Sequence, residues 1–404
     1  MSIDMRFRNE ADISQISPSV FFREHLPSLI DAGNACIQPW LESNSPDDFT
    51  LECGDNCWQL SVRGGGLSVA EGIAASGLHV RLQEEEFSGL INDEYTPMTF
   101  FTTGDLDLVR GNLPAYLDWW LILRAVIDRR PLHVPGTMTF LAKDGSPLDM
   151  RHAFTLDDSI EDMRHFLETA GFLHIQGVFS EDEMAALSRD MDAQQIAYTE
   201  GDGKSWWAST ADGVRRVVRM QSFDEVSDAT ARLLQDPRFT GLGDISGLGH
   251  VHNSLENNQV EALIKPLNVV QGISDLPWHK DCAQGRHSFE CCSLTVGISV
   301  TGADADSGQI RVIAGSHRAL IWPSMIADPQ EFGLPVVDLP TKTGDITIHL
   351  SCTLHMAQAP TSGERRVMYA GFRFPTVDTS SSSAARARRN RAREAAQHLS
   401  DKRR

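Results

Sequence analysis

The feature that most limits how this chain can fold is a series of short, strand-like runs in its second half. Runs of this length, rich in β-branched residues, are typical of strands rather than of long helices. They are Leu267–Ile273, Ser293–Val300, Gln309–Ile313, Asp345–Leu350 and Val367–Phe374. Many short antiparallel strands that enclose one site favour a double-sheet jelly roll, also called a double-stranded β-helix.

Two histidines and an aspartate are placed among these runs. His279 and Asp281 are two residues apart, so both side chains leave the same face of a strand. His355 follows much later, just past the run Asp345–His349. Two imidazoles and one carboxylate match the facial triad that holds non-haem Fe(II) and leaves further positions open. His349, six residues before His355, would share its face on a regular strand and is the alternative distal ligand.

Other motifs accompany the three residues in a definite order. The pair lies in the segment PWHKD, residues 277–281; a later segment, 307–318, ends in Gly-Ser-His-Arg; and Gly344-Asp345 opens the strand before His355. Arg366 stands eleven residues after His355. Together these motifs resemble the phytanoyl-CoA dioxygenase family of Fe(II)/2-oxoglutarate oxygenases. The resemblance covers residues 154–376 and implies a jelly-roll oxygenase domain with flanking helices.

The resemblance also implies roles for individual residues. His279, Asp281 and His355 would ligate Fe(II). Arg366 would hold the distal carboxylate of 2-oxoglutarate, because a planar guanidinium binds a carboxylate through two parallel hydrogen bonds. Its neighbour Arg365 is the alternative, since strand alternation turns the two arginines in opposite directions. On the preceding strand, Asn268 and Gln271 are candidate polar contacts to 2-oxoglutarate.

The reaction implied by the family uses Fe(II), 2-oxoglutarate and O₂, with ascorbate as a possible stimulating additive. 2-Oxoglutarate is decarboxylated to succinate and CO₂, and an unactivated C–H bond of the substrate is oxidised. Related halogenases lack the carboxylate ligand, so that halide can take its place. The presence of Asp281 therefore favours hydroxylation.

The first part of the chain has a different pattern. Its predicted elements are strands at 49–53, 58–62, 67–69, 78–82 and 106–109, a helix from Ser19 to Leu41 interrupted by Pro27, a short helix from Glu84 and a helix from Leu113 to Ile127. Gly64-Gly65-Gly66 reads as a hairpin turn. The order resembles the α+β fold of the type 2 sterol carrier proteins over residues 18–130, and implies an apolar tunnel. For Trp119, Trp120 and Leu123 we favour core packing over ligand lining.

Between and after these domains the sequence predicts connecting segments. Residues 131–153 have the proline and glycine density of a linker. Helices are predicted from Ser159 to Ala170 and from Ser180 to Met191, the second with a capping box of Ser180 and Glu183. Residues 199–224 are polar and are expected to form a long loop over the mouth of the site. Residues 377–404 are expected to be a disordered basic tail.

Charge and cysteine usage exclude several classes of function. The 404 residues carry a net charge of −19, and residues 386–404 contribute eight Arg/Lys against two acidic residues, which leaves −25 for the rest. So acidic a body argues against nucleic acid as a partner. The sequence contains no apolar run of about 20 residues, so we expect no membrane span. The first residues have no apolar signal region, and the seven cysteines fit reduced thiols in a cytoplasmic protein.

A carrier-like domain joined to an oxygenase suggests a small, apolar or lipid-like substrate. Two other interpretations stay open. One is a lipid-binding or carrier protein whose oxygenase domain is inactive, which would bind lipid without turning over 2-oxoglutarate. The other is a jelly-roll metalloenzyme of another reaction type, such as an isomerase or lyase that uses a different divalent ion.

Overall fold

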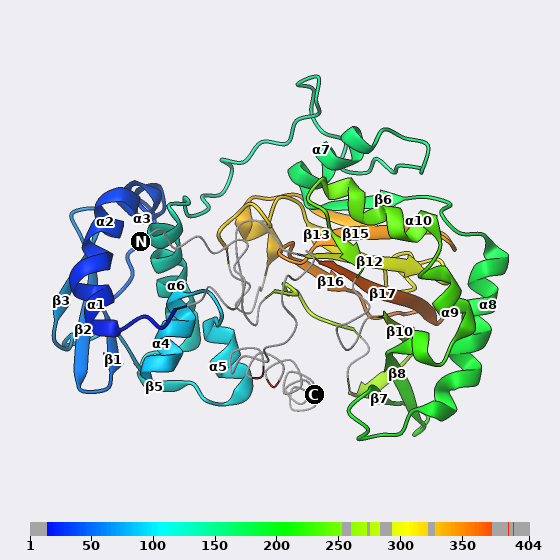
Figure 1. The fold of residues 1–404 in the computed structure, drawn as a ribbon, viewed down its shortest axis with the longest axis horizontal. Helices are drawn as coiled ribbons and strands as arrows, with labels where there is room; N and C mark the ends of the chain where they lie inside the picture. The colour runs from blue at the N-terminus through cyan, green and yellow to red at the C-terminus, as the bar shows by residue number, and fades with distance from the viewer. Residues whose placement is uncertain are drawn as a thin grey trace.

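The strands of the computed structural model gather into two groups, one from each half of the chain (Figure 1). The structure describes residues 14–252, 260–272, 275–282, 293–321 and 328–373, together with residues 387 and 391. The predicted disordered tail, 377–404, lies outside the described residues apart from those last two. No helix among the described residues has the length and apolar character needed to cross a bilayer.

The first group is a five-stranded sheet in the order β3-β2-β1-β4-β5. Its strands are β1 (Phe49–Cys53), β2 (Asn56–Arg63), β3 (Gly66–Glu71), β4 (Leu78–Leu82) and β5 (Asp107–Arg110). β1 and β4 run parallel, and the other neighbours are antiparallel. The predicted strands are therefore all present. Alternation sends Trp58 and Leu60 into the core, while Ser61 and Ser68 bond to each other on the opposite face.

Short and long helices cover the apolar face of this sheet. They are α1 (Pro18–Val20), the π-helix η2 (Phe21–His25), α2 (Leu26–Gly33), η3 (Asn34–Cys36), α3 (Gln38–Leu41), α4 (Glu84–Ile91), α5 (Pro97–Thr103) and α6 (Leu113–Asp128). Pro27 does not interrupt the helical run, which passes without a gap from the π-helix η2 into α2 at Leu26, one residue before the proline. The sequence interpretation missed α5, although Thr96 and Thr99 form a capping box ahead of it.

The tryptophans of α6 belong to the core of this domain. Trp119, Trp120 and Leu123 are 1%, 2% and 5% exposed, and the indole N–H of Trp119 donates to the carbonyl of Asp47 at 2.9 Å. Core packing is thus confirmed, while the likeness to sterol carrier proteins stays a prediction.

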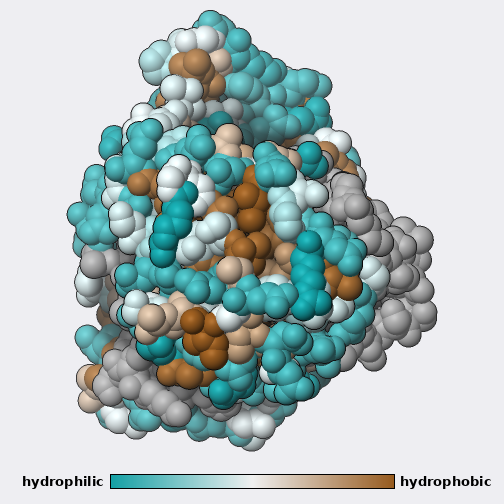
Figure 2. Space-filling view, turned by 90° about the vertical axis from the view of Figure 1, so that its left-hand side faces the viewer, coloured by the Kyte–Doolittle hydropathy of each residue, from teal (hydrophilic) through white to brown (hydrophobic). Residues whose placement is uncertain are grey.

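On the outside of the molecule, Figure 2 shows apolar side chains gathered near the middle of one face and framed by hydrophilic ones.

The second group forms the jelly-roll core that the sequence predicts. Its large sheet has the order β11-β7-β8-β10-β17-β12-β15-β6, with β9 also paired to β17, and its small sheet has the order β14-β13-β16. The strands of the large sheet are β6 (Phe172–Ile175), β7 (Ser205–Thr210), β8 (Arg215–Gln221), β9 (Val251–His252), β10 (Val260–Lys265), β11 (Val269–Gln271), β12 (Ser293–Ser299), β15 (Ile346–Leu350) and β17 (Arg365–Arg373). Those of the small sheet are β13 (Ile310–Ile313), β14 (Val336–Leu339) and β16 (His355–Ala357).

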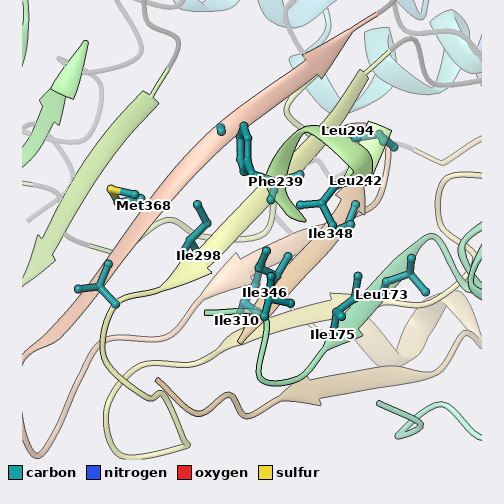
Figure 3. Packing of buried hydrophobic residues seen from close by; sticks show 14 of the residues in the cluster. Leu173, Ile175, Phe239, Leu242, Leu294, Ile298, Ile310, Ile346, Ile348 and Met368 are labelled. Carbon is teal, nitrogen blue, oxygen red and sulfur yellow. The ribbon is translucent and has the colours of Figure 1, made fainter. Parts of the chain in front are cut away.

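Helices cover the outer face of the large sheet, so the side chains along its strands alternate between this helix-covered face and the opposite face. They are α7 (Ile160–Ala170), α8 (Glu181–Ala193), α9 (Asp228–Leu233) and α10 (Pro237–Thr240). In β12, β15 and β17 the even-numbered side chains, such as Ile298, Ile348 and Met368, belong to the buried core, part of which is drawn in Figure 3. The odd-numbered side chains of the same strands therefore leave the opposite face, which we call the inner face.

The polar stretch 199–224 is a hairpin of the large sheet, not a loop over the site. β7 and β8 pair from Ser205 to Ser209 with a turn at Asp212-Gly213, where Gly213 has a φ of +81°. Val217 and Val218 are buried at 2% exposure. Their β-branched side chains and the Asp-Gly turn outweigh the polar composition that suggested a loop.

The predicted linker is held against the jelly roll. Phe140 packs on the core of the second domain, and the guanidinium of Arg318 lies 5.4 Å from its ring centroid. Leu132 forms a parallel bridge with Leu320, and the His133 ring bonds to the carbonyl of Phe332. A segment rich in proline and glycine is thus ordered by contacts that its composition does not reveal.

Gly344 enters β15 at a position that only glycine tolerates. Its φ is +83°, and a Cβ there would lie 1.9 Å from the carbonyl oxygen of Phe179. We expect Gly344→Ala to lower the free energy of unfolding by about 3 kcal/mol or more, from backbone strain and the clash together. Gly363→Ala is the control, because its φ is similar but no atom lies within 4 Å. Urea midpoints that fall equally for both variants would contradict this expectation.

Candidate metal centre

The structure brings His279, Asp281 and His355 together although 74 residues separate the last two. His279 and His355 form an isolated bridge, in which each backbone N–H donates to the other's carbonyl at 2.9 and 3.0 Å. Val312 of β13 pairs with His355 on its other side. One ligand atom from each of the three residues lies within 4.8 Å of the other two. The small sheet therefore supplies the distal histidine and holds the His-x-Asp segment beside it.

Hydrogen bonds orient both imidazoles toward the carboxylate. The Nδ1 of His279 bonds to the carbonyl of Pro277 at 2.7 Å, and that of His355 bonds to Thr353 at 2.9 Å. A carbonyl accepts but does not donate, so each Nδ1 carries a proton and each Nε2 is turned toward the carboxylate. Both Nε2 atoms lie 3.5 Å from Oδ1 of Asp281. Two imidazole nitrogens and a carboxylate oxygen converging on one point fit Fe(II).

The charges of the site also suit a metal ion. Burial alone would raise the pKa of Asp281, but His355, and then His279 and His349, hold it well below its usual value. Burial, reinforced by His349 and His279, lowers the pKa of His355 well below its usual value. The carboxylate is therefore ionised and the imidazole of His355 neutral, which are the forms that bind a cation.

His349 is placed behind the triad rather than in it. Its Nε2 lies 3.4 Å from Oδ2 of Asp281, whereas His279 and His355 face Oδ1. The ring is 1% exposed and stands 4.1 Å, centroid to centroid, from that of His355. Among the described residues neither ring nitrogen has a hydrogen-bond partner. The geometry thus favours His355 over His349 as the distal ligand.

Thr295 of β12 fixes the second oxygen of the aspartate. Its hydroxyl donates to Oδ2 of Asp281 at 2.7 Å. Because groups behind a ligand set its orientation, we expect Thr295→Val to lower affinity for Fe(II) by about tenfold to a hundredfold. Thr347→Val, the same change on the neighbouring inner-face strand, should leave affinity unchanged. Anaerobic metal titration of both variants checks this, and equal affinities would contradict it.

Arg366 is not placed where the sequence interpretation put it. It lies on the outer face of β17, where its guanidinium contacts Asp192 at 2.8 Å and the backbone and hydroxyl oxygens of Ser188, both on α8. Glu364 is a further partner. Arg366 has the same parity as the buried Met368, and strand alternation therefore keeps it on the helix side.

Arg365 occupies the inner face instead. It is 3% exposed, its Nη1 donates to the carbonyl of Gly308 at 2.6 Å, and its Nε has no partner among the described residues. Directly opposite in the sheet is Lys265 of β10, which is 2% exposed. Burial, and then repulsion from Arg365, lowers the pKa of Lys265 to about 7, against an opposing effect of Asp275. The sequence interpretation missed Lys265, although a lysine ending an apolar strand was a usable signal.

The other two predicted contacts lie at the edge of the large sheet. Asn268 is exposed in a turn with φ of +56°, and Gln271 is exposed on β11, which pairs with β7. Three strands separate β11 from β17. The structure therefore gives neither residue a place beside Arg365.

Comparison with known proteins gives the same assignment as the site. The family described as phytanoyl-CoA dioxygenase (PhyH) matches residues 167–368, half of the chain. Similar solved structures include the α-ketoglutarate-dependent epimerase SnoN from nogalamycin biosynthesis, with 20% identity over 56% of this chain and 91% of that one, TM-score 0.41. The carbocyclase SnoK from the same biosynthesis has 21% identity over 55% and 89%, TM-score 0.43. EctD from S. alaskensis with bound Fe has 18% identity over 56% and 82%, TM-score 0.43.

A search among curated proteins gave no match. The family match spans the strands and loops that carry all three predicted ligands. The chain therefore belongs to the phytanoyl-CoA dioxygenase family, whose enzymes use Fe(II) and 2-oxoglutarate.

Proposed function

We propose that this protein hydroxylates an unactivated C–H bond of a small molecule, with Fe(II) held by His279, Asp281 and His355. The observation that carries the proposal is the convergence of these three ligand atoms within 4.8 Å. Bound iron with 2-oxoglutarate supplies O₂-dependent oxidation coupled to release of succinate and CO₂. The protein's own contribution is to hold the ligands, orient both substrates and exclude water.

Arg365 and Lys265 are the residues that would hold 2-oxoglutarate. The guanidinium of Arg365 keeps an unpartnered Nε on the inner face, and the ammonium of Lys265 stands opposite in the sheet. Two adjacent buried cations are costly unless an anion neutralises them. A dicarboxylate that also reaches the metal would do so, and the fork of Arg365 suits its distal carboxylate.

Asp281 supports hydroxylation as the outcome. Its carboxylate is ionised and held by Thr295, so it fills the ligand position that a halide would otherwise need. We also propose a cytoplasmic location, because the cysteines that the structure describes form no disulfide.

The inner face supports a substrate with an apolar body and one polar group. Beyond Arg365 the strands present Val367, Tyr369 and Leu263 on this face. Farther along, Arg219 pairs with Glu261 and stacks 4.2 Å from the ring centroid of Trp206. The apolar positions fit the lipid-like skeleton that the carrier-like first domain suggests, and the ion pair could meet a hydroxyl or carbonyl oxygen.

Succinate formation tests the proposal directly. The protein is loaded anaerobically with Fe(II), and succinate is measured with 2-oxoglutarate and O₂, alone and with acyl, acyl-CoA and isoprenoid compounds. We expect turnover that His279→Ala abolishes. Bound iron without turnover across the whole panel would reject an oxygenase and favour the carrier interpretation. Metal-dependent conversion of a panel compound without succinate would point to an isomerase or lyase.

Lys265 should make 2-oxoglutarate binding depend on pH. Its pKa of about 7 means that the ammonium is charged below that pH and neutral above it, whereas both carboxylates of 2-oxoglutarate stay ionised. We expect the KM for 2-oxoglutarate to rise about tenfold as the pH increases through this range, from loss of one charged hydrogen bond. Lys265→Met should have a high KM that is flat with pH. A sloping profile in that variant would assign the titration to another group.

A further inference from the structure

Two cysteine thiols lie together immediately behind the metal ligands. The sulfur atoms of Cys282 and Cys352 are 3.3 Å apart, and neither residue forms a disulfide in this structure. Cys282 directly follows Asp281, and Cys352 precedes His355 by three residues. The pair therefore joins the two chain segments that supply the proposed iron ligands, and neither sulfur has a role in the proposed reaction.

The backbone around the pair is held in place by the fold. The N–H of Cys282 donates to the carbonyl of Ser351 at 3.4 Å, next to Cys352. The hydroxyl of Ser351 bonds to that of Ser293 on β12 at 2.7 Å. Thr353 donates its hydroxyl to the carbonyl of Gly171 at 2.8 Å, and the N–H of Leu354 donates to the hydroxyl oxygen of Ser316 at 2.7 Å. These anchors keep the Cys352 loop fixed, so the thiols stay near each other at high effective concentration.

We propose that Cys282 and Cys352 are a redox-modification site, at which a peroxide converts the two thiols into a disulfide. The two sulfurs together lose two electrons and two protons as the S–S bond forms. The O–O bond of the peroxide breaks and accepts them; hydrogen peroxide leaves as two water molecules. A dithiol such as dithiothreitol reverses the step and is itself oxidised to a disulfide.

Disulfide formation changes the metal centre through its geometry. A disulfide holds its sulfurs about 2.05 Å apart, so the pair must close by about 1.2 Å from its present separation. The Cys352 loop is anchored on three sides, and the movement therefore falls on Cys282 and on Asp281 beside it. Metal sites hold their ligand distances to within about 0.2 Å. The disulfide form consequently binds metal more weakly than the dithiol form.

The test uses metal-free full-length protein and Mn(II), which favours the same oxygen and nitrogen ligands without redox chemistry of its own. Protein is treated with one equivalent of hydrogen peroxide and digested under non-reducing conditions for peptide mass mapping. Mn(II) affinity is then measured by electron paramagnetic resonance before oxidation, after it, and after dithiothreitol. We expect a Cys282–Cys352 link and a loss of affinity of about tenfold to a hundredfold that dithiothreitol restores.

Single variants separate the site from general oxidation. Cys282→Ser and Cys352→Ser should each keep Mn(II) affinity through the peroxide step, so either one suffices if the other fails to fold. Cys36→Ser, which removes a cysteine of the first domain, should respond like the unaltered protein. A link from Cys282 to Cys291 or Cys292, which lie outside the described residues, would overturn the proposed pairing. The expected link without any change in affinity would overturn the coupling to the metal.

Discussion

Arg365→Ala should raise the KM for 2-oxoglutarate about a hundredfold, while Arg366→Ala should change it by less than about threefold. The first variant loses a charge-assisted pair of hydrogen bonds worth about 2–3 kcal/mol, and about 1.4 kcal/mol corresponds to a factor of ten. The second removes a guanidinium that contacts Ser188 and Asp192 on the helix side of the sheet. Initial rates of succinate formation at varied 2-oxoglutarate measure both constants.

Stability measurements add a second comparison between the two arginines, in which Arg366 is expected to have the larger effect. Arg366→Ala should lower the urea midpoint because it removes the contacts that the guanidinium makes from β17 to Ser188 and Asp192 on α8. Arg365→Lys is the conservative control: it keeps the charge but not the fork, and should recover only part of the affinity. A large KM effect at Arg366 with none at Arg365 would mean that β17 is turned by one residue in the active protein.

Asp281→Ala should abolish succinate formation and weaken Fe(II) binding by about a thousandfold. The variant removes the only negative charge among the three ligands and leaves the two imidazoles alone to hold the ion. A thousandfold loss of affinity corresponds to about 4 kcal/mol of binding free energy. Anaerobic titration with a competing chelator measures the affinity.

Three further variants test whether the loss arises at the metal site. Asp338→Ala removes a carboxylate of β14 that pairs with Arg311 at the surface, and should leave Fe(II) affinity unaltered. His355→Ala should behave like Asp281→Ala, whereas His349→Ala should weaken binding by only about tenfold, because it stands behind the carboxylate. An Asp281 variant that still binds Fe(II) with full affinity would exclude the triad as the iron site.

The metal triad could be predicted from the sequence because two of its members are close neighbours along the chain. His279 and Asp281 are two residues apart, and His355 follows a strongly β-branched run. The expectation that the first two share a strand was wrong, because His279 makes only an isolated bridge and Asp281 lies in a turn. The arginine could not be chosen by counting from His355, since the count passes through a loop in which one residue more or fewer reverses the face. The parity of Met368, Ala370 and Phe372 was the better guide, because buried apolar positions fix which side of β17 faces the helices.

Which strands pair across the sheet could not be predicted from local sequence patterns. Nothing in the sequence indicates that β10 lies beside β17, which is what places Lys265 opposite Arg365. For the same reason Asn268 and Gln271 were expected near the cofactor, although β11 pairs with β7 at the sheet edge. Local patterns recover strands and turns, whereas neighbours across a sheet depend on how the whole chain closes.

The division of the large sheet into even and odd positions separates two kinds of evolutionary change. Substitutions at Val296, Ile348 or Met368 alter the buried layer under the helices and are constrained by packing density. Those at Gly297, Val367 or Tyr369 alter the inner face, which also carries Arg365, and leave that layer untouched. A lineage can thus explore new substrates at inner-face positions while its scaffold stays constant. A combinatorial library restricted to the odd positions other than Thr295, His349 and Arg365 would follow the same route in the laboratory.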